Sequence, residues 1–106
     1  MSTRVYRLPV KTLYSLIIES GVTVESIYDG QDIVRINSSE EFIDTALSVD
    51  ACCVKVTYGG EFGTWDLVFW GAAPCEIISD YCSPEDSELS EKMDLIHDKF
   101  VMLFEG

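Results

Sequence analysis

Seven carboxylates lie close together in the last quarter of the sequence, and carboxylates are the groups that pair with Lys and Arg side chains. They are Asp80, Glu85, Asp86, Glu88, Glu91, Asp94 and Asp98. Four positions at i, i+4, i+7 and i+11 would share one row of a helix: Ser87, Glu91, Asp94 and Asp98. Successive carboxylates then rise by about 4.5 to 6 Å, the same order as the phosphate spacing of a nucleic-acid strand. The row predicts a surface that binds basic side chains.

A second interpretation of the same residues is a solvated helix face. Lys92 and Lys99 flank the row and would partly neutralise it. Glu88 and Lys92 are spaced to form an ion pair one turn apart, which is common on exposed helices. The sequence leaves both interpretations open.

Residues for catalysis are few. His97 is the single histidine, and a nucleophilic pair would need it to meet Cys53 or Cys82 in space. The chain has no nucleophile elbow, P-loop or dinucleotide fingerprint. The glycines of residues 59–63 connect two predicted strands and favour a hairpin loop over a phosphate site. The sequence therefore predicts a protein that is not an enzyme, with no catalytic residues.

The four cysteines, Cys52, Cys53, Cys75 and Cys82, do not have the paired spacing of a zinc site. Adjacent residues of a strand point to opposite faces, so Cys52 and Cys53 cannot readily share one ion. Without secretion, reduced thiols packed as small apolar side chains are the better interpretation. No metal and no cofactor is predicted.

Net charge decides which partners are favoured. The chain has 106 residues with a formal charge of −12. Residues 76–106 hold nine acids and two bases, whereas residues 1–18 hold Arg4, Arg7 and Lys11 and no acid. The negative net charge disfavours direct binding to nucleic acid and favours a protein partner with a basic surface. The basic head could also pair with the acidic tail of a second copy, as a homodimer.

The composition predicts one folded domain over residues 1–106. Apolar residues make up 47% of the chain, including 11% aromatic residues, which is too many for a disordered acidic protein. No apolar stretch approaches the roughly 20 residues of a membrane span, and the start has no signal-peptide features. We therefore expect a cytoplasmic protein.

The first half predicts two helices and two short strands. A helix is expected over residues 9–20, with Pro9 in its first turn and Gly21 ending it. Residues 22–37 read as a hairpin around Asp29-Gly30. Ser38 and Glu41 fit a capping box for a helix that ends near residue 48.

The second half predicts a meander of strands and a long helix. Strands are expected over residues 52–58, 64–70 and 75–81. The last helix is expected to start at Ser83-Pro84. Its apolar stripe should lie on the sheet and comprises Leu89, Met93, Ile96, Phe100, Leu103 and Phe104. The predicted fold is α+β: an antiparallel sheet of four or five strands with helices mainly on one face and a long C-terminal helix.

Aromatic residues near these strands are candidate anchors for a partner. Both faces of the strand over residues 64–70 carry apolar side chains, Trp65, Leu67 and Phe69 on one and Val68 and Trp70 on the other, so we expect a central strand with at least one Trp in the core. Trp and Tyr are enriched at binding hot spots. We expect anchors beside the acids among Tyr58, Phe62 and Trp70.

The segment from Trp65 to Gly71, followed by Pro74 and by Glu76–Tyr81, resembles a pattern in small proteins of bacteriophages and integrated elements. In those proteins an aromatic strand ends at a Gly turn, and an Ile-Ser-Asp-Tyr-like strand then leads into a helix. Some small acidic phage proteins are anti-CRISPR or other anti-defence inhibitors that occupy nucleic-acid-binding surfaces. The resemblance implies such a role in the cytoplasm of a host bacterium.

Taken together, the residues predict a non-enzymatic binding protein whose seven carboxylates pair with Lys or Arg of a partner. The resemblance implies that the partner is a host CRISPR or other nucleic-acid-binding defence complex. An immunity protein that neutralises a basic toxin would use the same electrostatics. An enzyme that uses Cys53 or Cys82 with His97 is the third alternative.

Overall fold

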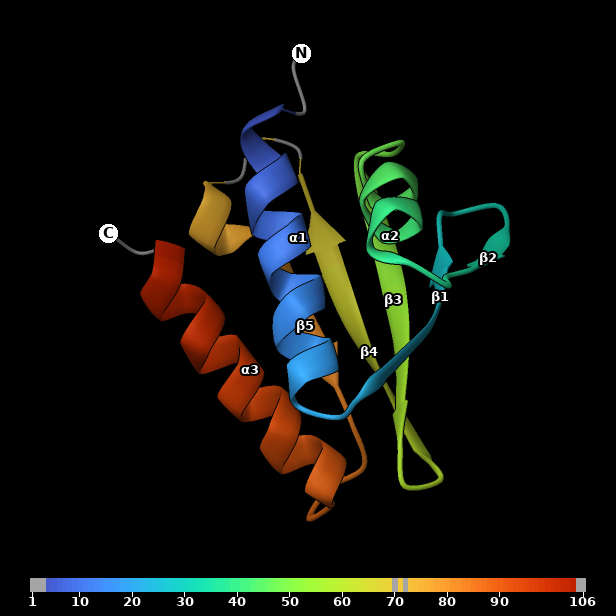
Figure 1. The fold of residues 1–106 in the computed structure, drawn as a ribbon, viewed down its shortest axis with the longest axis vertical. Coiled ribbons are helices and arrows are strands. Elements are labelled where there is room, and N and C mark those ends of the chain that lie inside the picture. Colours follow the sequence, from blue (N-terminus) through green and yellow to red (C-terminus); the bar gives the residue numbers. More distant parts are fainter. Residues whose placement is uncertain (1–3, 70, 72, 105–106) are drawn as a thin grey trace.

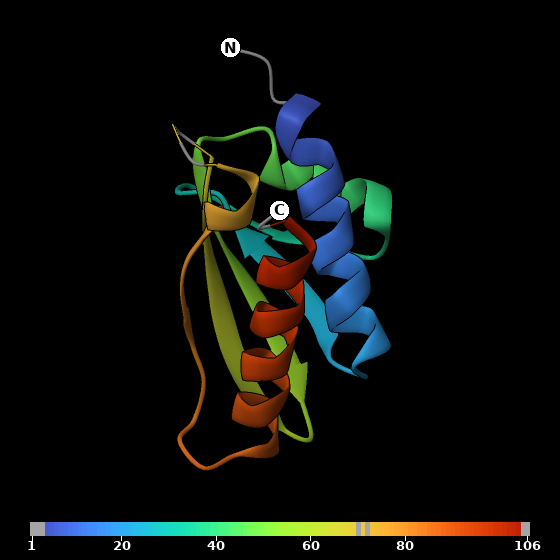
Figure 2. The ribbon, with the colours of Figure 1, turned by 90° about the vertical axis from the view of Figure 1, so that its left-hand side faces the viewer.

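The computed structural model describes residues 4–69, 71 and 73–104. Three helices cover one face of a five-stranded antiparallel sheet, whose strand order is β2-β1-β3-β4-β5 (Figure 1). The view in Figure 2 shows that the opposite face of the sheet carries no helix. This confirms the predicted α+β class and the long C-terminal helix. The elements are α1 (Arg4–Glu19), β1 (Thr23–Tyr28), β2 (Ile33–Arg35), α2 (Ser39–Ala46), β3 (Ala51–Tyr58), β4 (Glu61–Val68), η1 (Pro74–Glu76), β5 (Ile78–Cys82) and α3 (Glu88–Phe104).

Helix α1 begins before residue 9, so the predicted start was wrong and Pro9 lies inside the helix. Proline lacks the N–H that would bond the carbonyl four residues back, which costs roughly 3 kcal/mol in a helix interior. The apolar stripe begins before the proline and offsets this cost; its buried members are Tyr6, Val10, Leu13 and Ile17. The predicted end is confirmed, because Gly21 has φ +83° in the left-handed region beyond the last turn.

The β1–β2 hairpin and helix α2 form as predicted. The Asp29 carboxylate accepts hydrogen bonds from the N–H groups of Gln31 and Asp32, which fixes the turn between the two strands. The Ser38 hydroxyl accepts a 3.2 Å bond from the N–H of Glu41 and caps α2. Side-chain acceptors at both places satisfy backbone donors that the turn and the helix leave unpaired.

The β3–β4 hairpin is tighter than the loop predicted over residues 59–63. Tyr58 pairs with Glu61, so the turn consists of Gly59 and Gly60, at φ +60° and +85°. Two left-handed residues give the turn that matches the twist of the strands. Gly63 lies in β4 instead, where an added Cβ would meet the carbonyl oxygen of Cys82 at 2.7 Å. Its missing side chain lets α3 lie close to the sheet.

The segments around β5 and α3 start later than predicted. Residues 74–76 form the short helix η1, and β5 begins at Ile78. Helix α3 begins at Glu88 because the Ser87 hydroxyl caps it, accepting a 3.0 Å bond from the N–H of Ser90. Asp86 has φ +57°, outside the helical region, so a helix cannot run on from Ser83.

The core lies between the sheet and the three helices. From α3 it contains four members of the predicted stripe, Leu89, Met93, Ile96 and Phe100. Phe104 is half-buried, and Leu103 is 62% exposed, so its predicted place on the sheet was wrong. Trp65, Leu67 and Phe69 are buried on or just after the central strand β4, which confirms the expectation that at least one Trp packs in the core, whereas Trp70 lies outside the described residues.

Candidate acidic binding site

All seven predicted carboxylates are exposed at the surface. They lie on β5, on α3 or on the loop between these two elements. The structure places six of them in two groups, with Glu91 between the groups along α3, rather than in the single row that the sequence predicted. One group lies close enough to Tyr81 to act on its hydroxyl electrostatically, and the other lies at the start of α3.

The first group, which we call the Tyr81 cluster, consists of Asp80, Asp94 and Asp98. The Tyr81 hydroxyl donates a 2.7 Å hydrogen bond to Oδ1 of Asp94, across from β5 to α3. This bond, then burial, then the negative charges of the three aspartates raise the pKa of Tyr81 to about 12. The three carboxylates therefore act on one phenol, although they come from two elements.

Asp80 also protects the edge of the sheet. Its Oδ1 accepts a 2.8 Å bond from the N–H of Tyr81. An edge strand with free N–H groups invites pairing with another chain, and a charged side chain there opposes it. Asp80 pairs across the ladder with Asp66, which is also exposed. The sequence did not predict that Asp66 lies beside Asp80, because the strand register decides that contact.

The aromatic ring of Tyr81 packs against the core and so connects the Tyr81 cluster to it. It lies 4.9 Å from the Trp65 ring and 5.1 Å from the His97 ring, measured between centroids. Such aromatic pairs add stability beyond the area they bury. His97 thus packs on β5 at the edge of the apolar stripe, and its Nδ1 is buried without a hydrogen-bond partner.

The second group, which we call the α3-start cluster, consists of Glu85, Asp86 and Glu88, joined by Glu61. These four acids line one cavity of about 420 Å³ together with Tyr58, Gly59 and Ser87. Glu61 was assigned to a loop in the sequence analysis. Because the turn is only two glycines long, Glu61 belongs to β4 and meets the loop that precedes α3.

Glu91 lies one turn further along α3 and, with Glu88, lines a neighbouring hollow of about 350 Å³. The hollow also contains Lys92, but this lysine is engaged elsewhere. Its Nζ donates a 2.9 Å bond to the carbonyl oxygen of Ser20 and lies 4.7 Å from the centroid of the Tyr58 ring. The ammonium group thus stabilises the C-terminal end of α1. The ion pair Glu88–Lys92 that the sequence permitted is not formed.

Ion pairs are scarce for so charged a chain. Among the side chains that the structure describes, two are formed, Arg7–Glu40 at 3.3 Å and Lys55–Glu25 at 3.5 Å. Neither involves a predicted site residue. The seven carboxylates are therefore exposed and without a cationic partner in the described part of the chain. Of the predicted basic head, Arg7 forms one of these ion pairs and Lys11 is exposed, while the side chain of Arg4 lies outside the described part of the structure.

The two thiols considered as partners of His97 lie on the other side of the sheet. Cys53 alternates with buried residues of β3, and Cys82 pairs with Thr64, which alternates with buried residues of β4. Both therefore face the side without helices, whereas His97 is on α3. Cys52 is buried, and burial raises its pKa to about 12. All four cysteines are free. Cys82 is exposed, against the expectation that the thiols are packed.

Among the described residues, no group of His, Cys, Asp or Glu side chains is placed to hold a metal ion.

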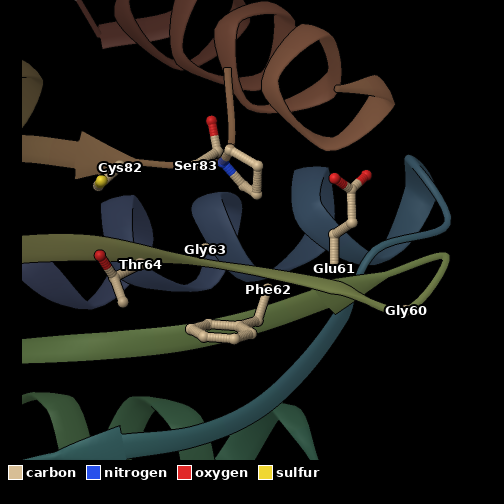
Figure 3. A pocket seen from close by; sticks show the side chains of 8 residues that line it. Gly60, Glu61, Phe62, Gly63, Thr64, Cys82 and Ser83 are labelled. Atoms are coloured by element: carbon tan, nitrogen blue, oxygen red, sulfur yellow. The ribbon is translucent and has the colours of Figure 1, made fainter. Parts of the chain in front are cut away.

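A pocket of about 530 Å³ adjoins the α3-start cluster, where β4 extends past the end of β5 (Figure 3). Phe62, a predicted anchor, forms one wall and is 60% exposed. Tyr58, the second, is half-buried under Lys92. Sequence reasoning did not predict this pocket, which needs residues from β4 and from the segment after β5.

Within the described residues, no helix is long and apolar enough to cross a membrane. The chain matches no protein family, no curated protein and no solved structure.

Proposed function

We propose that this chain is a non-enzymatic binding protein that docks its acidic surface on a basic, nucleic-acid-binding surface of a protein partner. The single observation that carries the proposal is the set of seven exposed carboxylates without cationic partners on β5, α3 and the loop between them. A folded protein of charge −12 repels itself, and a basic partner relieves this repulsion.

Side-chain hydrogen bonds tie both groups of carboxylates to the fold, which supports recognition over mere solubility. The Tyr81 hydroxyl binds Asp94 at 2.7 Å, and Ser87 caps the start of α3 beside Glu85, Asp86 and Glu88. A preorganised array loses less conformational entropy on binding than mobile side chains do. Exposed carboxylates compete with phosphates for the same Lys and Arg side chains.

The partner that we propose is a nucleic-acid-binding defence complex of a bacterial host, inhibited in the way of anti-CRISPR proteins. The resemblance of residues 65–81 to small phage proteins supports this choice, together with the acidic surface. Long-range electrostatic attraction to a basic surface also raises association rates, which favours an inhibitor that competes with nucleic acid.

The test compares two variants with the same loss of charge. Glu85→Ser, Glu91→Ser and Asp98→Ser remove site carboxylates and spare Asp94, whose bond to Tyr81 supports the fold. Glu19→Ser, Asp32→Ser and Asp44→Ser remove three exposed acids from other parts of the surface. Each tagged protein is incubated with host lysate at low and at raised ionic strength, and bound proteins are identified by mass spectrometry.

We expect the wild type and the control to retain the same basic partner, and the site variant to bind it at least threefold more weakly. Exposed charge pairs contribute about 0.2 to 1 kcal/mol each, so the loss of three weakens binding by roughly threefold to a hundredfold. Raised salt should release the partner from all three proteins. Equal retention by the site variant and the control would contradict the proposal.

The identity of the retained protein decides the kind of partner. Wild-type protein should displace labelled nucleic acid from a defence complex, and the site variant should not. Recovery of one small basic toxin would instead favour the immunity alternative.

A further inference from the structure

The pocket beside the α3-start cluster combines an apolar wall with an acidic rim. Its apolar part is formed by Phe62, Pro84 and the side chain of Cys82, with the backbone of Gly63 between them. Figure 3 shows the Phe62 ring and the Glu61 carboxylate on opposite sides of β4. A phenyl ring that is 60% exposed beside a concave apolar surface is typical of an interaction site.

The acidic rim belongs to the neighbouring cavity. Glu61 lines both the apolar pocket and the cavity that holds Glu85, Asp86 and Glu88. The two hollows therefore adjoin at Glu61. An occupant that extends from one into the other passes from apolar contacts to a group of four carboxylates. Charge complementarity requires the second part of such an occupant to be cationic.

We propose that this double hollow binds a segment of the partner in which an aromatic or large aliphatic side chain is adjacent to Lys or Arg. The apolar side chain fills the pocket beside Phe62, and the cation pairs with the acids at the start of α3. The inference rests on the proposed function, because it names the chemistry of the partner segment that docks there. It adds a specific anchor to a surface that is otherwise electrostatic.

Lys55 sets the orientation of the segment. Its Nζ lies 4.9 Å from the centroid of the Phe62 ring and 3.5 Å from Oε1 of Glu25. A cation on this side of Phe62 would be repelled by Lys55, whereas a cation on the side of Glu61 meets carboxylates. The apolar residue therefore lies nearer to Lys55, and the basic residues lie nearer to α3.

Cys82 provides a local reporter of occupancy. It is exposed and lines the pocket, while Cys52 is buried with a pKa of about 12 and reacts poorly with alkylating reagents. The rate at which iodoacetamide modifies Cys82, followed by mass spectrometry of proteolytic fragments, measures access to the pocket. Cys75, which is half-buried and lies outside this pocket, is the internal reference.

The probes are three synthetic peptides of the same length. One carries a tryptophan followed by two lysines, the second has alanine in place of tryptophan, and the third has glutamates in place of lysines. At saturation we expect the first peptide to slow the alkylation of Cys82 at least fivefold and to leave Cys75 unchanged. The alanine and glutamate peptides should protect Cys82 less than twofold.

Two variants test whether Phe62 forms the binding wall. Phe62→Ser should abolish the protection by the tryptophan–lysine peptide. Ile33→Ser is the matched control, because it removes a large exposed apolar side chain, 73% exposed, from β2 at the other edge of the sheet. This control should keep the wild-type protection.

The pocket assignment is overturned if the tryptophan–lysine peptide leaves the Cys82 rate unchanged, or if Phe62→Ser is protected as well as the wild type. After either result, the acidic surface is still supported as the binding site if the site variant described above no longer retains the lysate partner. Failure of the proposed function has a different signature: equal retention of the lysate partner by the site variant and its control.

Discussion

The hydroxyl of Tyr81 donates a 2.7 Å hydrogen bond to Oδ1 of Asp94, and this bond joins the edge strand β5 to helix α3. It places a site carboxylate in a structural role, since Asp94 both belongs to the acidic surface and holds the strand beneath it. The same ring packs on Trp65 and on His97. Tyr81 therefore couples the acidic surface to the core.

Replacing this tyrosine, Tyr81→Phe, should lower the free energy of unfolding by about 1 kcal/mol, because the ring packing stays and the bond to a carboxylate is lost. Urea denaturation followed by fluorescence measures the change. Tyr14→Phe is the control, since its half-buried ring packs on Phe42 and its hydroxyl makes no hydrogen bond in the described structure. A loss of stability as large in Tyr14→Phe would argue against the role of the Asp94 bond.

The effect of Tyr81→Phe on the free energy of unfolding should depend on pH. The pKa of Tyr81 is raised from 10.0 to about 12, so the folded protein retains a proton that the unfolded chain releases. Its contribution to stability is complete below pH 10 and is lost as the pH rises to about 12. The difference in unfolding free energy between the wild type and Tyr81→Phe should shrink over that window. A constant difference would contradict the raised pKa.

Gly63→Ala should destabilise the fold by about 2 kcal/mol or more through steric conflict. The added Cβ would lie 2.7 Å from the carbonyl oxygen of Cys82 and 2.8 Å from Sδ of Met93. Met93 is flexible, but the Cys82 carbonyl is main chain and cannot move aside cheaply. The double variant Gly63→Ala with Met93→Ala should therefore remain less stable than Met93→Ala alone, which thermal unfolding can check. Full tolerance of Gly63→Ala would show that α3 lies further from the sheet.

Lys92→Met should lower the free energy of unfolding by about 1 kcal/mol, because the Nζ contacts with the Ser20 carbonyl and the Tyr58 ring are lost while the aliphatic chain remains. Lys99→Met is the matched control, with the same charge change at an exposed position. The two variants are compared by urea denaturation. Equal stabilities would mean that Lys92 acts only through net charge.

Several local patterns predicted their elements correctly. The Ser38 cap, the Asp29-Gly30 turn and the alternation along β3 depend on residues within a few positions of one another. The start of α3 could not be predicted in this way. Ser83 and Ser87 are both suitable caps, and the left-handed Asp86 and the bonds of Ser87 select the later one.

The candidate site also depends partly on the local sequence and partly on the tertiary structure. The sequence by itself determined which residues carry the negative charge, where the apolar stripes run and which fold class results, because composition and periodicity are local properties of the chain. Only the tertiary structure decided that Asp80, Asp94 and Asp98 meet at Tyr81, and that Glu61 joins the start of α3. Strand register and the angle at which α3 lies on the sheet bring distant residues together, and no spacing along the chain encodes them.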